Sequence, residues 1–316
     1  MLDKLVQKLI KKDRRAVARS ISIVESNSSL SDELLENIYS KVGNAYRIGI
    51  TGPPGAGKST ITNNLTKYYL KNGSKVGIIA VDPTSPFTGG ALLGDRVRMS
   101  EIGNNPDVFI RSMATRGSLG GLSKKATDAA DILDSAGYEI IILETVGVGQ
   151  SELDIAKAAD TTIVVLVPES GDAVQAMKAG LMEIADFFVL NKSDRPGAKQ
   201  AITALQTILM LRDHDAESWM PDIIESIASE NIGTEKIASE IDRHKHYLNK
   251  HSLFTKRREN QFKNRIKEIV ESKLKEELWN ESGENSLNLS LEKITQGNLS
   301  PYRIAENIIE EFKKRI

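Results

Sequence analysis

Nine consecutive residues constrain this sequence more than any other feature. Residues 52–60 read Gly-Pro-Pro-Gly-Ala-Gly-Lys-Ser-Thr, which fits the pattern G-x-x-x-x-G-K-[ST]. A short apolar run, Arg47–Thr51, precedes them and a helical pattern follows, as a phosphate-binding loop requires. In such a loop, successive backbone N–H groups and the N-terminus of the following helix face an anion. The segment therefore predicts a site for a nucleoside di- or triphosphate within an α/β fold.

Each residue type in this loop has an expected task. The glycines let the backbone approach the phosphates, Lys58 reaches the β- and γ-phosphates, and the Ser59 hydroxyl ligates Mg²⁺. The alternative is an ordinary Gly-Pro turn before a helix, but both the strand before and the helix after favour the phosphate site. The predicted nucleotide-binding residues here are Gly52, Pro53, Pro54, Gly55, Ala56, Gly57, Lys58, Ser59 and Thr60.

The rest of the chain divides by its hydrophobic pattern. Residues 1–43 show helical spacing of apolar residues, which predicts an N-terminal helical extension. Residues 44–233 alternate short apolar runs with helical stretches, which predicts a P-loop domain with a doubly wound, mostly parallel sheet. Residues 234–316 are helical and rich in Lys and Glu, with a polar break at Asn280–Leu289 that we expect to be a loop. The predicted strands are Arg47–Thr51, Val76–Asp82, Val108–Arg111, Glu139–Glu144, Thr162–Val167, Phe187–Asn191 and Ile223–Ala228.

Composition excludes several classes of function. The chain has 316 residues with 42 Lys and Arg against 43 Asp and Glu, so it has no general electrostatic footprint for nucleic acid or an anionic membrane. It has no cysteine, which excludes thiolate metal sites and a cysteine nucleophile. The longest apolar runs, such as Thr161–Pro168, are far shorter than the roughly 20 residues that span a bilayer. We expect a soluble, cytoplasmic protein without a secretory signal.

A second motif indicates which base is bound. Asn191-Lys192-Ser193-Asp194 follows the apolar run Phe187–Leu190, at the edge of the sheet where open α/β folds bind ligands. A carboxylate at Asp194 can accept from the N1–H and the exocyclic amine of guanine, and adenine offers no matching pair of donors. Taken alone, such a tetrapeptide is more often a turn after a strand. Behind a phosphate loop in the correct order, Asn191, Lys192 and Asp194 predict guanine binding.

Two acidic residues end other predicted strands. Asp82 closes Val76–Asp82, and Glu144 closes Glu139–Glu144. Because Mg²⁺ bound to a nucleotide prefers oxygen ligands at this edge, both residues are candidates for its shell together with Ser59. Each could instead cap the next turn or helix. Glycine-rich loops lie at residues 88–90, 117–121 and 147–150. We expect at least one to change conformation with the state of the nucleotide, and the alternative is that they are only tight connections.

Several longer segments carry a resemblance to a known family. The chain resembles the methylmalonyl-CoA mutase-associated GTPases of the MeaB or ArgK type, from its N-terminal helices to Pro301-Tyr302. The P-loop alone is much less specific than the segments that carry this likeness: 51–60 (TGPPGAGKST), 81–96 (VDPTSPFTGGALLGDR), 110–121 (IRSMATRGSLGG), 144–152 (ETVGVGQSE) and 178–186 (KAGLMEIAD).

The resemblance implies a function and a set of roles. It implies a GTPase that chaperones an adenosylcobalamin-dependent acyl-CoA mutase, gates cofactor loading and protects or rescues that enzyme, as a homodimer formed through its C-terminal helices. Asp82 matches the position associated with Mg²⁺, and Glu144 begins the third GTPase motif. The family usually places Ser-Ala after the last strand, where backbone groups contact guanine. This chain reads Ser-Ile-Ala-Ser there, which implies guanine contacts at Ile227, Ala228 and Ser229.

The residue that orients the attacking water is left open by the sequence. No glutamine directly follows Gly147, and Gln150 comes three residues later. Residues 168–178 resemble a further switch through which the partner mutase raises hydrolysis. We therefore expect slow intrinsic hydrolysis that the partner accelerates by aligning Asp172 or Lys178. The candidate catalytic residues are Lys58, Glu144, Gln150, Asp172 and Lys178.

Three alternative functions remain. A metallochaperone GTPase would need a cluster of His or Cys ligands, whereas the histidines are scattered at His214, His244, His246 and His251. A kinase for a transport protein, an older interpretation of the family, would use ATP, which the guanine motif opposes. A nucleotide-dependent scaffold needs the same pocket as a catalytic chaperone, and only a rise in turnover with the partner separates the two.

Overall fold

The computed structural model describes residues 2–26, 28–82, 100–114, 121–145, 151–168, 180–211, 215, 217–295 and 299–315. Within them, seven strands form one parallel sheet, so the predicted fold class is confirmed. Each observed strand overlaps one of the predicted apolar runs. Their bounds are β1 Tyr46–Thr51, β2 Val76–Asp82, β3 Val108–Ala114, β4 Ile140–Thr145, β5 Thr161–Leu166, β6 Phe187–Asn191 and β7 Ile223–Ser226.

The strand order places the phosphate loop in the middle of the sheet. The order is β3-β2-β4-β1-β5-β6-β7, with β1 between β4 and β5. In the register, Ile50 of β1 pairs with Glu144 of β4 and with Ile163 of β5. Because all strands are parallel, their carboxyl ends meet at one edge, where loops from neighbouring strands converge.

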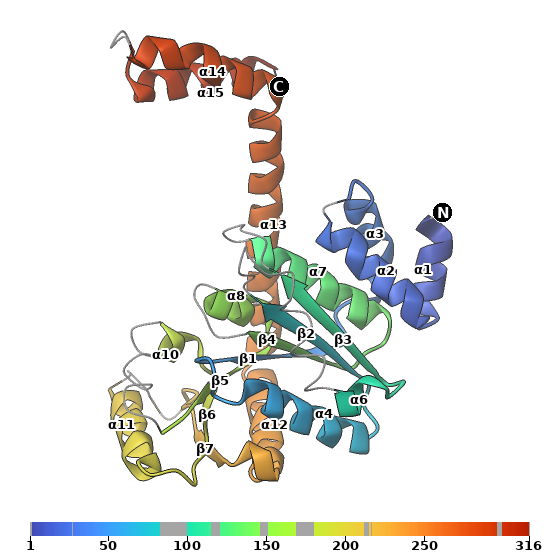
Figure 1. Ribbon diagram of the computed structural model, residues 1–316, viewed down its shortest axis with the longest axis vertical. Coiled ribbons are helices and arrows are strands. Elements are labelled where there is room, and N and C mark those ends of the chain that lie inside the picture. Colours follow the sequence, from blue (N-terminus) through green and yellow to red (C-terminus); the bar gives the residue numbers. More distant parts are fainter. Residues whose placement is uncertain are drawn as a thin grey trace. The chain divides into compact units, whose positions relative to one another are not determined.

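Helices cover both faces of this sheet (Figure 1). On one face α4 and α12 pack against Ile48 and Ile50 of β1, and on the other α7, α8, α10 and α11 cover residues such as Leu143 and Leu166. The strands are buried on both sides, which explains their continuous apolar runs. The bounds are α4 Lys58–Lys71, α6 Ser100–Gly103, α7 Gly121–Ser135, α8 Ser151–Ala158, α10 Leu181–Ile184, α11 Ala198–Met210, the short 3₁₀ turn η2 Ala228–Glu230 and α12 Thr234–Lys250.

Three N-terminal helices form a further layer over α7. They are α1 Leu2–Ile10, α2 Arg14–Glu25 and α3 Ser31–Ile38, followed by the 3₁₀ turn η1 Tyr39–Lys41. Their buried apolar residues belong to the same core cluster as those of α7. Polar contacts fasten α2 beside the edge strand β3: Arg14 donates to the carbonyl oxygen of Gly103 at 3.0 Å, and Arg111 of β3 forms an ion pair with Glu25. These contacts attach the extension to residues beside the β3 edge of the sheet.

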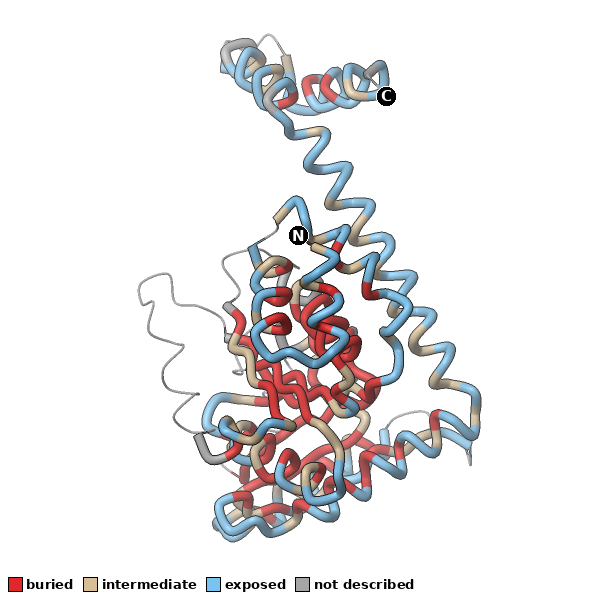
Figure 2. The backbone as a smooth tube through the Cα atoms, turned by 90° about the vertical axis from the view of Figure 1, so that its right-hand side faces the viewer, coloured by how far each residue is buried: buried red, intermediate tan, exposed pale blue. Residues whose placement is uncertain are grey.

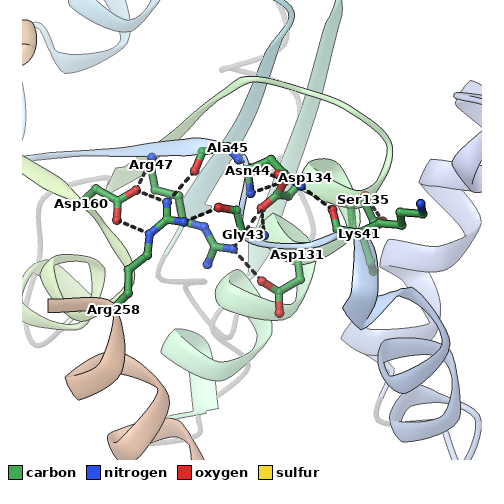
Figure 3. Close-up of polar contacts among 11 residues, drawn as sticks. Lys41, Gly43, Asn44, Ala45, Arg47, Asp131, Asp134, Ser135, Asp160 and Arg258 are labelled. Carbon is green, nitrogen blue, oxygen red and sulfur yellow. Dashed lines mark hydrogen bonds and ion pairs between the residues drawn. The ribbon is translucent and has the colours of Figure 1, made fainter. Parts of the chain in front are cut away.

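Buried ion pairs hold the edge of the sheet opposite the phosphate loop (Figure 3). Asp160, which precedes β5, accepts from the backbone N–H of Arg47 at 2.9 Å and from two guanidinium nitrogens of Arg258 at 2.8 and 3.0 Å. Arg258 also donates to the carbonyl oxygens of Gly43 and Ala45. It lies in the first turns of α13, Leu253–Leu278. This arginine therefore joins α13, the segment before β1 and the loop before β5.

A second group of polar contacts involves Arg257, the residue before Arg258. Arg257 donates twice to Asp186, at 3.0 Å each, and His244 Nε2 lies 3.3 Å from the same carboxylate. His244 Nδ1 contacts the Thr161 hydroxyl at 2.7 Å, and the Tyr46 hydroxyl contacts that hydroxyl at 2.6 Å. A carboxylate can only accept, so a neutral His244 carries its proton on Nε2, which faces Asp186. Its Nδ1 then accepts from the Thr161 hydroxyl, and the Tyr46 hydroxyl donates to Thr161. Burial lowers the pKa of His244 to about 4, which agrees with the neutral form.

The chain divides into two compact units, residues 1–258 and residues 259–316. Buried residues concentrate in the sheet and flanking helices of the first unit (Figure 2). The second unit contains most of α13, followed by α14 Glu281–Thr295 and α15 Pro301–Arg315. No helix among the described residues is both long and apolar enough to cross a membrane.

One sequence-based expectation is wrong in the second unit. Residues 280–289 were expected to form a loop, but 281–289 begin α14. Asn280 caps the N-terminus of this helix, because its Oδ1 accepts from the backbone N–H groups of Ser282 and Gly283, both at 3.1 Å. The helix then packs against α15, where Ile304 and Ile308 are buried. Tertiary packing outweighs the low helix propensity of the Asn- and Ser-rich stretch.

Candidate functional site

The loop between β1 and α4 has the backbone that its glycines predict. Gly52 has φ +134° and Gly57 has φ +92°, conformations that favour glycine. Steric crowding adds a second requirement. A Cβ atom on Gly52 would lie 2.1 Å from the carbonyl oxygen of Val165, and one on Gly57 would lie 2.2 Å from Asn191 Nδ2. Larger residues at either position would push the loop away from the neighbouring strands.

Lys58 begins α4 with its side chain turned back along the loop. The residue is buried, and its ammonium group donates to the carbonyl oxygens of Gly52 at 2.7 Å and Pro53 at 2.9 Å. These contacts hold a positive charge over the loop and beside the N-terminus of α4, where the helix dipole also favours an anion. The arrangement suits the phosphate groups of a nucleotide.

Two side chains with oxygen atoms, a hydroxyl and a carboxylate, meet next to Lys58. The Ser59 hydroxyl donates to Glu144 Oε1 at 2.5 Å, and Glu144 is buried near the carboxyl end of β4. Asp82 ends the neighbouring strand β2, which pairs with β4 through Ala80 opposite Glu144. The side chain of Asp82 lies outside the described part. A hydroxyl and a carboxylate are hard oxygen ligands, so Ser59 and Glu144 could hold a divalent cation next to the loop.

Asn191 connects the phosphate loop to the loop after β7. Its Nδ2 donates to the carbonyl oxygen of Ala56 at 2.8 Å, and its Oδ1 accepts from the backbone N–H of Ala228 at 3.0 Å. Lys192 follows with φ +56°, and Asp194 is exposed at the same edge of the sheet. Asn191 is thus a bridge between two loops, while Asp194 remains accessible to a ligand.

The loop after β7 closes on itself. Ile227 and Ile232 exchange two backbone hydrogen bonds of 3.1 Å, and the short turn η2 lies between them. Ser193 N–H donates to the carbonyl oxygen of Ser226 at 3.1 Å, which keeps this loop beside the Asn191–Asp194 segment. Ile227 therefore contributes its backbone N–H and carbonyl oxygen to the turn.

The structure brings most of the predicted residues together around one edge. The contacts above link the loop 52–60 to Glu144 and, through Asn191, to the turn 227–229. Lys192 and Asp194 follow Asn191 at the same edge. Gln150, Asp172 and Lys178 lie outside the described residues. Among the residues whose side chains are described, no group of three or more His, Cys, Asp or Glu could hold a metal ion.

One residue of this region was missed from the sequence. Asn64 lies on α4 and donates through Nδ2 to the carbonyl oxygen of Ala228 at 2.8 Å. A signal was present: Asn64 falls three residues after Ile61 and one before Leu65, on the face of the helix that is buried. A buried polar residue on an apolar face requires a hydrogen-bond partner, but the sequence does not show which one.

Comparisons with known proteins decide the family. The family model described as methylmalonyl-CoA mutase-associated GTPase MeaB matches residues 17–283. The chain belongs to the MeaB family of P-loop GTPases. The resemblance seen in the sequence is therefore confirmed, and the enzyme class is that of a GTPase.

Individual relatives agree with this assignment. A Pyrococcus abyssi protein named as a GTPase is 45% identical, over 99% of this chain and 97% of its own length. The mitochondrial methylmalonic aciduria type A homolog of Mus musculus is 31% identical, over 99% of this chain and 80% of its own length. The crystal structure of a LAO/AO transport system kinase matches this fold with a TM-score of 0.74 and 28% identity, covering 99% of this chain and 97% of that one.

Proposed function

We propose that this MeaB-family GTPase is a chaperone of an adenosylcobalamin-dependent acyl-CoA mutase, with methylmalonyl-CoA mutase as the first candidate. In this proposal it acts in the cytoplasm, gates loading of the cofactor, and protects or reactivates the mutase. The match to the mutase-associated family over residues 17–283 carries the proposal. The name of the mouse relative refers to methylmalonic aciduria, which supports the choice of methylmalonyl-CoA mutase as the first candidate partner.

The phosphate groups of GTP would bind in the loop between β1 and α4. Backbone N–H groups of residues 52–60 and the N-terminus of α4 would face the phosphates. Lys58, now held by the carbonyl oxygens of Gly52 and Pro53, would turn toward the β- and γ-phosphates. Phosphoryl transfer depends mainly on positioning and charge neutralisation, so this loop would supply much of the catalysis.

Ser59 and Glu144 are the described residues that would hold Mg²⁺, with Asp82 proposed as the third member of the set. The hydrogen bond between Ser59 and Glu144 supports this, since it places two hard oxygen ligands next to the phosphate loop. When bound, Mg²⁺ would neutralise charge that develops on the phosphate oxygens. Glu144 would meanwhile orient the Ser59 hydroxyl through their hydrogen bond.

The guanine base would lie against Asn191, Lys192, Asp194 and the turn 227–229. The exposed carboxylate of Asp194 supports this placement because it can accept from both donors of guanine. Asn191 would keep the turn 227–229 at a fixed distance from the phosphate loop. A preference for GTP over ATP follows from this arrangement.

Gln150, Asp172 and Lys178 remain proposed catalytic residues on sequence grounds. We propose that the mutase aligns Asp172 or Lys178 to complete the site for hydrolysis. Lys178→Ala should then reduce the stimulation by the mutase while leaving the slow intrinsic rate close to that of the wild type. Unchanged stimulation would exclude Lys178.

We further propose a homodimer formed through the C-terminal region, residues 234–316, with residues 1–43 and 44–233 as the helical extension and the GTPase domain. An apolar stripe on α13 supports the dimer. Phe262, Ile266, Val270 and Leu274 recur every four residues and are between 39% and 61% exposed. Such a stripe lies on one side of a helix and suits packing against a second copy.

Steady-state hydrolysis tests the proposed function. GTP turnover by the purified protein is measured alone and with the mutase from the same host, with ATP as the control nucleotide and Lys58→Ala as the control variant. We expect a clear rise with the mutase that is specific to GTP and absent from the variant. Tight GTP binding without any rise would favour a nucleotide-dependent scaffold instead.

A further inference from the structure

The backbone of Ala228 is held from two sides by side-chain amides. Asn191 of β6 accepts from its N–H at 3.0 Å, and Asn64 of α4 donates to its carbonyl oxygen at 2.8 Å. Ala228 and Asn191 are buried, and Asn64 is 9% exposed. The two amides therefore hold the two peptide groups that flank the Cα of Ala228, in the turn that would lie against the base.

Asn64 also belongs to the helix that would hold the phosphates. Lys58 and Ser59 form the first turn of α4, and Asn64 follows in its second turn. An α-helix rises about 1.5 Å per residue and is stiff over such a length. One rigid helix would thus contact the phosphates through its N-terminus and the base-side turn through Asn64. A nucleotide has to span both points.

We propose that Asn64 is a positioning residue for nucleotide recognition, which sets the distance between the phosphate loop and the base-side turn 227–232. The inference rests on the proposed guanine site. Asn64 itself does not need to touch the nucleotide. Its hydrogen bond to Ala228 holds the turn in the register in which it can meet a guanine whose phosphates are bound at the start of α4.

The turn has internal contacts that would survive the loss of Asn64. Ile227 and Ile232 exchange two backbone hydrogen bonds, and the carbonyl oxygen of Ala228 also accepts from Asn231 N–H at 3.2 Å. Without the amide of Asn64, the turn keeps its shape and its contact with Asn191. It loses its direct side-chain tie to α4. The expected defect is therefore in recognition of the base and not in folding.

The test uses Asn64→Leu, which has a similar shape and no donor, and Asn64→Ala, which adds no bulk. The matched control is Asn44→Ala, because Asn44 Nδ2 also donates to a backbone carbonyl, that of Lys41 at 3.1 Å, but lies before β1 at the opposite edge of the sheet. Equilibrium binding of GDP, IDP and ADP is measured for each protein, together with its melting temperature.

We expect both Asn64 variants to bind GDP about tenfold more weakly, which corresponds to about 1.4 kcal/mol. ADP binds through the phosphates without the guanine contacts, so its affinity should change less than about twofold. IDP keeps the O6 oxygen and the N1–H of guanine, so its affinity should weaken together with that of GDP. The preference for GDP over ADP therefore falls about tenfold, and Asn44→Ala keeps the wild-type preference.

Three results would overturn the inference. Equal weakening of GDP and ADP would assign Asn64 a general structural role, and so would loss of folding in both variants. Wild-type affinity for both GDP and ADP would show that the hydrogen bond does not affect recognition. Failure of the proposed function looks different, because the wild-type protein itself would then show no preference for GDP over ADP.

Discussion

Replacing Arg258 by methionine should destabilise the first unit by an amount that the contacts allow us to work out. The change removes both guanidinium bonds to Asp160, whose side chain is 1% exposed, and the bonds to the carbonyl oxygens of Gly43 and Ala45 (Figure 3). Removal of one partner from a buried ion pair costs about 3–5 kcal/mol. Arg258 is 17% exposed and Asp160 keeps the N–H of Arg47, so the lower end, about 3 kcal/mol, applies.

The assay is urea unfolding at pH 7, with thermal melting as a second measure. For a unit of this size, about 3 kcal/mol corresponds to a fall in Tm of roughly 6–12 °C. Arg303→Met is the matched control, because its ion pair with Glu306 is 63% exposed on both sides and should contribute below about 1 kcal/mol.

A double variant isolates the charge on Asp160. In the background of Asp160→Asn, the replacement Arg258→Met no longer leaves a buried charge without its partner. It should therefore lower the free energy of unfolding clearly less than it does in the wild type. A loss below about 1 kcal/mol for the single variant Arg258→Met would place this pair with solvent-exposed ion pairs and refute the reasoning.

Other predictions concern the phosphate loop, pH and assembly. Gly52→Ala should abolish nucleotide binding, because its Cβ would lie 2.1 Å from the carbonyl oxygen of Val165 at φ +134°; titration with GDP checks this, and wild-type affinity would contradict it. His244 has a pKa of about 4 when folded against an ordinary 6.5, so the unfolded chain binds more protons between these values and stability falls as the pH drops through them. From pH 6.5 to 5 the free energy of unfolding should fall by between about 1 and 2 kcal/mol in urea unfolding. His244→Gln should remove this dependence and the exposed His246→Gln should not. Ile266→Asp should convert the proposed dimer to a monomer in light scattering while GDP still binds, and a persistent dimer would place the interface elsewhere.

Much of the sheet could be predicted because its strands are parallel and buried on both faces. Val76–Asp82 and Phe187–Asn191 are continuous apolar runs, and their observed bounds agree with the sequence. The phosphate loop could also be predicted from the sequence, since its glycines adopt backbone conformations that favour glycine. Local chemistry determines these features, so a local pattern reveals them.

Features that depend on distant contacts could not be predicted. The stretch 281–289 looked like a loop because its composition is polar, yet a cap from Asn280 and packing against α15 make it helical. Asn64 and Ala228 are 164 positions apart in the chain and meet only after α4 packs beside the end of β7. The clamp between Asp160 and Arg258 likewise spans 98 positions. A single sequence contains the partners of such contacts but not their pairing.

Loading of adenosylcobalamin onto the cofactor-free mutase tests the central claim most directly. Loading is followed by absorbance with this protein present together with GTP, with a non-hydrolysable GTP analogue, or without nucleotide, and Lys58→Ala with GTP serves as the control. The account predicts that the bound nucleotide controls loading, so that the analogue and GTP give different extents of transfer and the variant does not respond to GTP. Identical loading in all four samples would contradict a chaperone that is gated by GTP.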